Sequence, residues 1–431
     1  MNNIKKPELL APAGTFEKMQ YALAYGADAV YAGLPRFSLR ARENDFQEEK
    51  VAQALDYAHS LGKKFYLTMN IYPHNRKVDS FERALERVAR LKPDGLIMAA
   101  PGMIMVARER FPELDVHLST QANTINWRTV QFWHRLGVKR IILSRELSID
   151  EIKEMRQRVP EIELEVFVHG AICIAYSGRC LLSNYFTHRD ANQGTCTNAC
   201  RWQYNLYSQP ENFEAEYDRY QPIKGSYFIE ERERPGELME IDEDEHGTYI
   251  MNAKDLSTIH ILNELIEAGV DSLKIEGRTK SHYYVSVITR AYRQAIDSYF
   301  QPNRSAEQIF QEVYAVANRG YVTGFLERNP KEDGQNYEQG HSGNQTRIFT
   351  GLVDEWDDRQ RRARVRVRNR FETGDRMELV TPQDTIPFTV SDIFDPEGKK
   401  VTVAHGGAHD VFLPLPVVPP RFSLLRKVNS G

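Results

Sequence analysis

"YGADAVYAG", residues Tyr25 to Gly33, contains the end of a helix, a turn and a whole β-strand. Gly26 follows an apolar helical stretch, at a position where glycine adopts the left-handed conformation without strain. The same arrangement recurs in "LGKKFYLTMN", "LGVKRIILSR" and "AGVDSLKIEG", with the glycine at Gly62, Gly137 and Gly269. The runs that follow are mostly continuous apolar stretches, which is typical of parallel strands covered on both faces. The sequence therefore predicts a fold of repeated strand and helix units.

Eight extended runs are separated by stretches with apolar residues at helical spacing. The runs are Glu8–Ala13, Asp28–Gly33, Lys64–Asn70, Gly95–Ala100, Asp115–Thr120, Arg140–Arg145, Leu164–Gly170 and Ser272–Gly277. Eight such units in succession predict an α/β fold, a TIM-like (β/α)8 barrel. In such barrels the residues just after each strand gather at one face and carry the chemistry.

The chain has 431 residues, which is more than one core usually supports. We expect residues 1–335 to form the barrel domain, with residues 171–248 as a cysteine-rich insertion after the seventh strand. Residues 340–431 are expected to form a small C-terminal all-β barrel domain. Short alternating runs such as "ARVRVRNRFETGDRMELV", with turn signals such as "ETGD", are the basis for that second domain.

Composition excludes some classes of protein. The net charge is −4 and the pI is about 6.3, so the chain as a whole is no basic nucleic-acid binder. Any nucleic-acid contact must come from a local patch. The N-terminal residues lack an apolar stretch of signal-peptide length, and the longest apolar stretch, Gly95 to Ala107, is too short to span a bilayer. We expect a soluble cytoplasmic protein with no membrane partner.

A row of arginines in the C-terminal domain is the candidate patch for nucleic acid. The alternation of the expected strand places four guanidinium groups on one face, those of Arg364, Arg366, Arg368 and Arg370. Such a row suits binding to phosphates. The alternative is an edge strand that its charge protects from aggregation.

All four cysteines lie in "HGAICIAYSGRCLLSNYFTHRDANQGTCTNACRW", residues His169 to Trp202. Their spacing is C-x6-C-x15-C-x3-C, and four thiolates suit zinc or an iron–sulfur cluster. The first pair is too widely spaced for a zinc knuckle and no histidine ligand pattern is nearby, which favours the cluster over zinc. Disulfides or free thiols are further alternatives. The four candidate ligands are Cys173, Cys180, Cys196 and Cys200.

Polar residues at the strand ends are the other candidates for the site. The expected catalytic residues are His169, Glu276 and Arg278. The expected substrate-binding residues are Asn70, His74, Gln121, Asn123, Arg145 and Tyr176. His169 would transfer a proton beside the cysteines, and Arg145 or Arg278 would bind a dicarboxylate. Each residue has an alternative role as a loop cap or structural ion pair. The sequence contains neither H-E-x-x-H nor G-x-S-x-G, so two common hydrolase sites are missing.

The segment "FVHGAICIAYSGRCLLSNYFTHRDANQGTCTNACRW" closely resembles the collagenase-like peptidase family. The motifs "PELLAPAG", "YGADAVYAG", "HLSTQAN", "ILSREL" and "LKIEGR" extend the resemblance from about Pro7 to the C-terminal domain. It implies an iron–sulfur-dependent tRNA hydroxylase that converts wobble uridine to 5-hydroxyuridine without oxygen. It also implies prephenate as co-substrate and a 4Fe–4S cluster bound by the four cysteines. One cluster moves one electron at a time, so an electron-transfer partner is a further expectation. The alternatives are a peptidase and a hydroxylase of ribosomal RNA or a quinone precursor.

Overall fold

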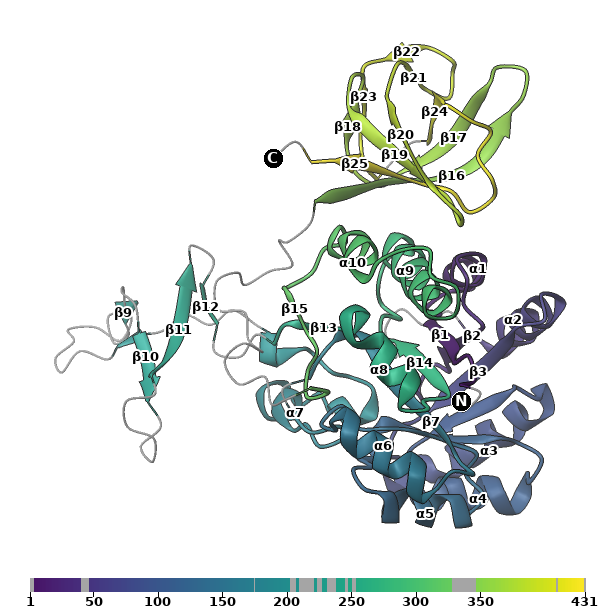
Figure 1. Ribbon diagram of the computed structural model, residues 1–431, viewed down its shortest axis with the longest axis vertical. Coiled ribbons are helices and arrows are strands. Elements are labelled where there is room, and N and C mark those ends of the chain that lie inside the picture. Colours follow the sequence, from purple (N-terminus) through teal and green to yellow (C-terminus); the bar gives the residue numbers. More distant parts are fainter. Residues whose placement is uncertain are drawn as a thin grey trace.

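The computed structural model describes residues 4–39, 46–173, 175–201, 207–208, 221–222, 227–230, 238–244, 247–249, 253–327, 346–407 and 410–429. Most of these residues form two bodies, a barrel of parallel strands with helices around it and an antiparallel β region packed against one side (Figure 1). Among the helices that the structure describes, none combines the length and hydrophobicity of a membrane span.

Eight parallel strands form the barrel, and each corresponds to one of the predicted runs. They are β1 (Glu8–Pro12), β2 (Ala29–Gly33), β3 (Lys64–Met69), β4 (Gly95–Met98), β5 (Val116–Leu118), β6 (Arg140–Ile142), β7 (Glu163–Ala171) and β14 (Ser272–Ile275). The strands follow one another in chain order. Because β14 pairs with both β7 and β1, the sheet is closed. The predicted (β/α)8 barrel is confirmed.

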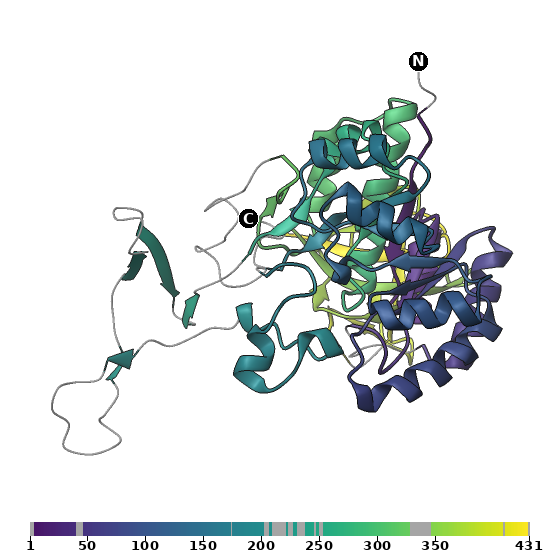
Figure 2. The same ribbon diagram turned by 90° about the horizontal axis from the view of Figure 1, so that it is seen from below.

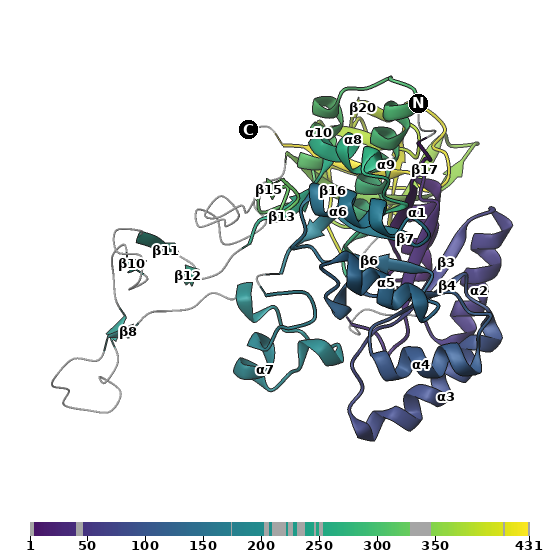
Figure 3. The same cartoon turned by 60° about the horizontal axis from the view of Figure 1, so that its bottom comes forward.

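Helices alternate with these strands and surround the barrel (Figure 3). They are α1 (Phe16–Ala24), α2 (Glu48–Ser60), α3 (Asn75–Leu91), α4 (Pro101–Arg110), α5 (Trp127–Arg135), α6 (Ile149–Arg158), α8 (Leu262–Glu267), α9 (His282–Phe300) and α10 (Ala306–Tyr314). Their apolar faces and the outward side chains of the strands form the largest core. The sequence signals for helix ends are in place. Ser148 and Glu151 form a capping box at the start of α6, and the four helix-ending glycines of the repeat have positive φ.

The cysteine-rich insertion follows β7, as predicted. Residues 171–201, here called the cysteine segment, contain α7 (Leu182–Thr187) and the 3₁₀ turns η2 (Ala191–Gln193) and η3 (Ala199–Arg201). Beyond it come β8 (Tyr207–Ser208), β9 (Gln221–Pro222), β10 (Tyr227–Glu230), β11 (Leu238–Asp244) and β12 (Gly247–Tyr249). These strands lie apart from the barrel and the β region (Figures 1 and 2). Within the predicted insertion, residues 174, 202–206, 209–220, 223–226, 231–237 and 245–246 lie outside the described residues.

After the insertion the chain rejoins the barrel. Strand β13 (Asp255–Ser257) pairs antiparallel with β7, and β15 (Tyr321–Val322) pairs parallel with β13. The two strands extend the sheet beside β7 and add to the wall at the end of the barrel where the cysteine segment begins.

The C-terminal region is an antiparallel β domain, which confirms the predicted class. Its strands are β16 (Arg347–Asp357), β17 (Arg362–Val367), β18 (Phe371–Glu372), β19 (Arg376–Val380), β20 (Thr385–Thr389), β21 (Ile393–Phe394), β22 (Lys400–Val401), β23 (Val403–Ala404), β24 (Asp410–Pro414) and β25 (Leu424–Val428). Eight of them form one sheet in the order β20-β19-β25-β16-β17-β24-β21-β22. The domain boundary expected between residues 335 and 340 lies outside the described residues.

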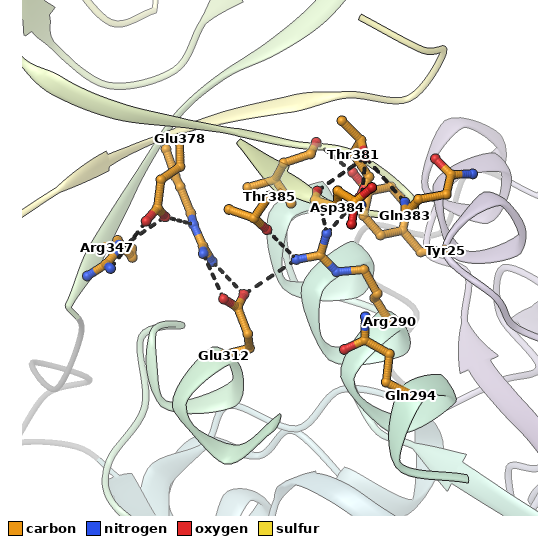
Figure 4. A network of polar contacts seen from close by, with 12 residues as sticks. Tyr25, Arg290, Gln294, Glu312, Arg347, Glu378, Thr381, Gln383, Asp384 and Thr385 are labelled. Carbon is orange, nitrogen blue, oxygen red and sulfur yellow. Dashed lines mark hydrogen bonds and ion pairs between the residues drawn. The ribbon is translucent and has the colours of Figure 1, made fainter. Parts of the chain in front are cut away.

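Buried polar contacts join the β domain to the barrel helices (Figure 4). Arg290 of α9 donates to the carbonyls of Thr381 and Asp384, at 2.7 and 2.8 Å. Arg426 of β25 is buried and pairs with Glu312 of α10 at 3.1 Å and with Glu378 at 2.6 Å. These charged and polar groups pair with each other across the boundary between the barrel and the β domain. The two domains therefore form a single packed unit.

Candidate active site at the barrel mouth

A cavity of about 560 Å³ opens where the barrel strands end and the cysteine segment begins. All four cysteines line it. Of the other predicted site residues, the cavity brings together Asn70, Gln121, Arg145, Tyr176, Glu276 and Arg278. The volume is typical of a small-molecule site. The cavity thus lies at the face where a barrel of this kind carries its chemistry.

The cysteine segment is held against the barrel by specific contacts. The backbone N–H of Ser177 donates to Glu146 Oε1 at 2.9 Å. Gly178 has φ +75°, and a β-carbon there would lie 2.0 Å from the carbonyl oxygen of Gln121. Farther along, Lys77 Nζ donates to Gln193 Oε1 at 3.0 Å. The cysteine segment is therefore held in place at the barrel mouth. At position 178 it approaches the barrel so closely that glycine is required there.

The four thiols are free of disulfides, with Cys173 exposed and the other three partly exposed. The backbone N–H of Asn198 donates to Cys196 Sγ at 3.4 Å. Across the described ranges, no three His, Cys, Asp or Glu side chains are grouped closely enough to hold a metal ion. Four thiols on one cavity are the right donor set for a cluster or zinc, and binding either would require them to draw together.

An ion pair between Arg145 and Glu276 crosses one wall of the cavity. Arg145 Nη2 lies 3.2 Å from Glu276 Oε2, and Arg145 Nη1 donates to the carbonyl of Ala171. The guanidinium also stacks on Phe167, with its central carbon 4.0 Å from the ring centroid. Gly170 makes this arrangement possible, because a β-carbon there would lie 2.7 Å from Glu276 Cβ. The pair presents one cation and one carboxylate to a ligand.

A second group of contacts fixes the loop after β2. Arg278 donates to the carbonyl of Leu39, and Asn70 Oδ1 accepts from the Leu39 N–H at 3.1 Å. Asn70 Nδ2 in turn donates to Ser119 Oγ at 3.0 Å. Gly33 leaves room for the guanidinium, since a β-carbon there would lie 2.2 Å from Arg278 Nη1. Arg278 and Asn70 therefore both line the cavity and hold its wall in place.

Lys274 lies deep in the cavity and was missed by the sequence reasoning, which treated it as part of a strand. Its Nζ lies 2.7 Å from Glu165 Oε1 and 4.4 Å from the centroid of the Tyr31 ring. Burial lowers the pKa of Lys274, and the neighbouring Glu165 carboxylate opposes that effect. The lysine in an otherwise apolar strand, followed two residues later by Glu276, was the available signal. It supplies a buried amine at the floor of the site.

Beneath Lys274 a network of charges fills the barrel interior. Arg140 Nη1 lies 2.6 Å from Glu8 Oε1 and 3.1 Å from Glu165 Oε2. Burial by itself would raise the pKa of Glu8, but Arg140 lowers it overall. His117 is buried nearby, and its pKa is lowered well below the usual value because burial disfavours its charged form. The network fixes the Glu165 carboxylate and, through it, the Lys274 ammonium.

The structure places His169 outside the cavity lining, against the expectation that it would act beside the cysteines. The pairing of β7 with β14 shifts register between Lys274 and Ile275, which adds a residue on β7. His169 then packs among the rings of Tyr284, Tyr292 and Tyr321. Burial lowers the pKa of His169 to about 3, so the imidazole is neutral at pH 7. Its position is that of a core histidine.

Two other predicted residues also lie outside the cavity lining. His74 is the N-cap residue of α3, and Asn123 Nδ2 donates to Ser144 Oγ at 3.3 Å. Both follow strands that end at the cavity, but their loops carry them past its lining. Adjacency to a strand end in sequence is therefore not sufficient for a place in the site.

The predicted arginine row on β17 is largely engaged in ion pairs. Arg364 lies 3.3 Å from Glu355 and 3.6 Å from Asp354. Arg366 lies 2.7 Å from Asp354 and contacts Glu17 of α1 across the domain boundary. Arg370 lies 2.6 Å from Glu372, and Arg368 is exposed. Arg364 and Arg366 share a face of β17, but Arg368 and Arg370 lie beyond the end of the strand at Val367 and do not continue the predicted row. Acidic neighbours pair with three of the four arginines.

Comparison with known proteins places the chain in a family. Residues 14–336 match Peptidase family U32, and residues 345–426 match the Peptidase family U32 C-terminal domain. tRNA hydroxylation protein P of Escherichia coli is 49% identical over 443 residues, covering 99% of this chain and 98% of the relative. The Haemophilus influenzae protein of the same name is 48% identical over 430 residues, covering 95% and 94%. A collagenase of Porphyromonas gingivalis is 28% identical over 337 residues, covering 75% and 74%. The chain therefore belongs to peptidase family U32.

Proposed function

We propose that this protein hydroxylates a wobble uridine of tRNA to 5-hydroxyuridine at the cavity in the barrel mouth. The observation that carries the proposal is the meeting of all four cysteines with a set of basic side chains around one cavity. The names of the two full-length relatives, both tRNA hydroxylation proteins, support the hydroxylation of tRNA.

The charge of the cavity supports an anionic co-substrate. Among the described residues, its lining includes five basic side chains and two acidic ones. The basic ones are Arg145, Lys274, Arg278, Lys280 and Arg319, and the acidic ones are Glu146 and Glu276. Prephenate, the proposed oxygen donor, carries two carboxylates. Lys274 at the floor is paired with Glu165, and Arg145 at the wall is paired with Glu276. Each has further N–H groups that would bind one carboxylate, because charge-assisted hydrogen bonds to carboxylates are among the strongest in proteins. The rings of Tyr31 and Phe167 would pack against the carbon skeleton.

Hydroxylation at C5 of uracil removes a hydrogen and adds oxygen, which is a two-electron oxidation. Cys173, Cys180, Cys196 and Cys200 would hold an iron–sulfur cluster, which supplies one-electron transfer when bound. The atoms and electrons balance if prephenate loses CO2 and its ring hydroxyl to give phenylpyruvate, that hydroxyl becomes the C5–OH, the C5 hydrogen leaves as a proton, and the electron-transfer partner accepts the two electrons. The residues of this chain orient the reactants: Lys274 and Arg145 hold the acid, and the cysteine segment covers the cavity against water.

The uridine must leave its stack to reach the cavity. Enzymes that modify a base in RNA act on unpaired nucleotides, whose bases can be drawn out and held between side chains. The anticodon loop offers such a base at its wobble position. Asn70 and Gln121 in the cavity lining provide the amide groups that would read the edge of the uracil ring.

Nucleoside mass spectrometry of bulk tRNA tests the proposal. Cells that lack the gene are grown without oxygen and complemented with wild type, Cys173→Ala, Lys274→Met or the control His74→Ala. We expect 5-hydroxyuridine derivatives to be restored by wild type and His74→Ala, and to be lost with Cys173→Ala and Lys274→Met. Normal levels in the gene-deleted cells would overturn the proposal.

The relationship to a collagenase supplies the second candidate, a peptidase. Purified protein in which all four cysteines are replaced by serine separates the two functions. Release of peptides from collagen by that variant, together with unchanged tRNA nucleosides in the deleted cells, would favour the peptidase.

A further inference from the structure

The cysteine segment carries exposed aromatic and basic side chains side by side. We call Tyr176, Arg179, Tyr185, Phe186 and Arg189 the aromatic ridge. Tyr185 is 82% exposed, Tyr176 61% and Phe186 48%, and Leu181 beside them is 69% exposed. Single exposed apolar residues are ordinary, but several within one short segment mark an interaction surface. Figures 1 and 3 show α7, which bears Tyr185 and Phe186, projecting from the side of the barrel.

The ridge is basic and its charge is not neutralised locally. Residues 171–201 contain three arginines, and their one acidic residue is Asp190. Asp190 accepts a hydrogen bond from the Asn192 N–H at 2.8 Å, so it serves the turn at η2. Arg179 and Arg189 are exposed, and within the part of the chain that the structure describes no acidic side chain pairs with either of them. The surface therefore suits a polyanion.

The ridge is also rigid and continuous with the cavity. Ser183 Oγ donates to the carbonyl of Arg189 at 2.8 Å and accepts from the Thr197 N–H at 3.1 Å, which ties α7 to the loop that carries Cys196. Tyr185 and Phe186 pack edge to face, with ring centroids 5.5 Å apart. Tyr176 both lines the cavity and belongs to the ridge. An RNA strand lying on the ridge would lead directly into the cavity.

We infer that the aromatic ridge binds the unpaired nucleotides that flank the target uridine in the anticodon loop. The bases of these nucleotides stack on Tyr185 and Phe186, and their phosphates bind to Arg179 and Arg189. This inference rests on the proposed function and adds to it the surface on which the RNA binds. Interleaved aromatic and basic side chains match single-stranded RNA, because every base has a stacking face and every nucleotide carries a charge. A duplex stem offers its phosphates but not its base faces.

Fluorescence anisotropy with two labelled RNAs tests the inference. One is an anticodon stem-loop, and the other is a fully paired duplex of the same length. The proteins are wild type, Tyr185→Ala with Phe186→Ala, the pair Arg179→Gln with Arg189→Gln, and the control Phe132→Ala, which removes an exposed aromatic side chain on α5. Circular dichroism and cysteine accessibility show whether each variant keeps the fold of the segment. If the alanine variant does not, Tyr185→Leu with Phe186→Leu replaces it, which keeps apolar bulk but removes both aromatic faces.

We expect the aromatic double variant to bind the stem-loop about tenfold or more weakly and the duplex unchanged, because base–aromatic stacking contributes that much per base. The arginine variant should reduce the slope of log K against log salt by about 0.7 for each phosphate that the protein no longer neutralises. Phe132→Ala should match wild type. If wild type binds the stem-loop and the ridge variants bind it equally well, the inference is wrong and the proposed function stands. If wild type binds neither RNA, both are wrong.

Discussion

The β domain and the cysteine segment both present arginines, but the two groups have different surroundings. Arg364 and Arg366 on β17 lie within 3.6 Å of carboxylates, and Arg426 is buried between two glutamates. Arg179 and Arg189 in the cysteine segment are exposed, and among the described residues no carboxylate pairs with them. In the first group, Arg364 pairs within the β domain, whereas Arg366 and Arg426 join that domain to the barrel helices. The second group is available to a ligand.

A count of arginines therefore does not locate a nucleic-acid site. A guanidinium already paired with a carboxylate shares its charge and its N–H groups between that carboxylate and a phosphate, so its net contribution to phosphate binding is smaller. The four-arginine row was the more conspicuous pattern in the sequence. The two isolated arginines of the cysteine segment, next to exposed aromatic rings and to the cavity, are the better candidates for RNA contact.

The largest expected effect is on the stability of the β domain. Arg426→Met leaves Glu312 and Glu378 largely buried with fewer cationic partners, and we expect a loss of about 3–5 kcal/mol in the free energy of unfolding. Urea denaturation measures it. The control Arg376→Met removes an exposed arginine of β19 and should change stability by less than about 0.5 kcal/mol. Equal effects of the two changes would contradict the structural role of Arg426.

The next largest effect concerns the contact between the cysteine segment and the barrel. Gly178→Ala places a β-carbon against the carbonyl of Gln121 and strains a positive φ, so the segment must lift from the barrel. We expect hydroxylation to fall by about 10²-fold, since a displacement of about 1 Å costs that much. The melting temperature should change little. Gly62→Ala, at another positive φ with open space around it, is the control for backbone strain alone. Equal activity of the two variants would show that the close approach to Gln121 is unimportant.

A matched pair of single variants compares the two arginine groups directly. Arg366→Gln should lower stability by roughly 0.5–1 kcal/mol, the value of a partly exposed ion pair, and leave the salt dependence of RNA binding unchanged. Arg179→Gln should leave stability unchanged and reduce that salt dependence. Thermal unfolding and anisotropy at several salt concentrations measure both. If Arg366→Gln reduced the salt dependence of RNA binding and Arg179→Gln lowered stability instead, the roles proposed for β17 and the cysteine segment would be reversed.

The smallest expected effect is a pH dependence of domain packing. His282, 3.0 Å away, and Arg366 lower the pKa of Glu17 to about 2, against the burial that raises it. A carboxyl group with a depressed pKa stabilises the fold above its unfolded pKa, and that contribution disappears as pH falls. The difference in melting temperature between wild type and Glu17→Gln should therefore be full above about pH 4.5 and shrink toward pH 2. A difference that is constant over this range would show that Glu17 does not act through its charge.

The sequence was sufficient for the architecture because barrel strands carry strong local signals. Apolar runs occur in all eight units, a glycine such as Gly26 or Gly269 ends the helix in four of them, and each predicted strand was found. The same regularity placed the cysteine segment at the mouth of the barrel. These features depend on residues close together along the chain, so a single sequence is enough to reveal them.

The site was less predictable because it depends on register and on distant partners. One added residue in β7 turns His169 out of the barrel, and no local pattern marks that shift. Lys274 is part of the site because Glu165, 109 residues away, stabilises a buried ammonium. The ion pairs of β17 involve Glu17, 349 residues from Arg366. Spacing along a strand could not reveal any of these contacts.

Photochemical crosslinking shows which part of the protein lies next to the wobble uridine. An anticodon stem-loop with 4-thiouridine at the wobble position is irradiated with the full-length protein, and the crosslinked peptides are identified by mass spectrometry. If the reaction occurs in the cavity under the cysteine segment, the crosslinks will lie in residues 171–201 or 274–280. Crosslinks concentrated in residues 362–370 of the β domain would contradict this and return the arginine row to the centre of RNA binding.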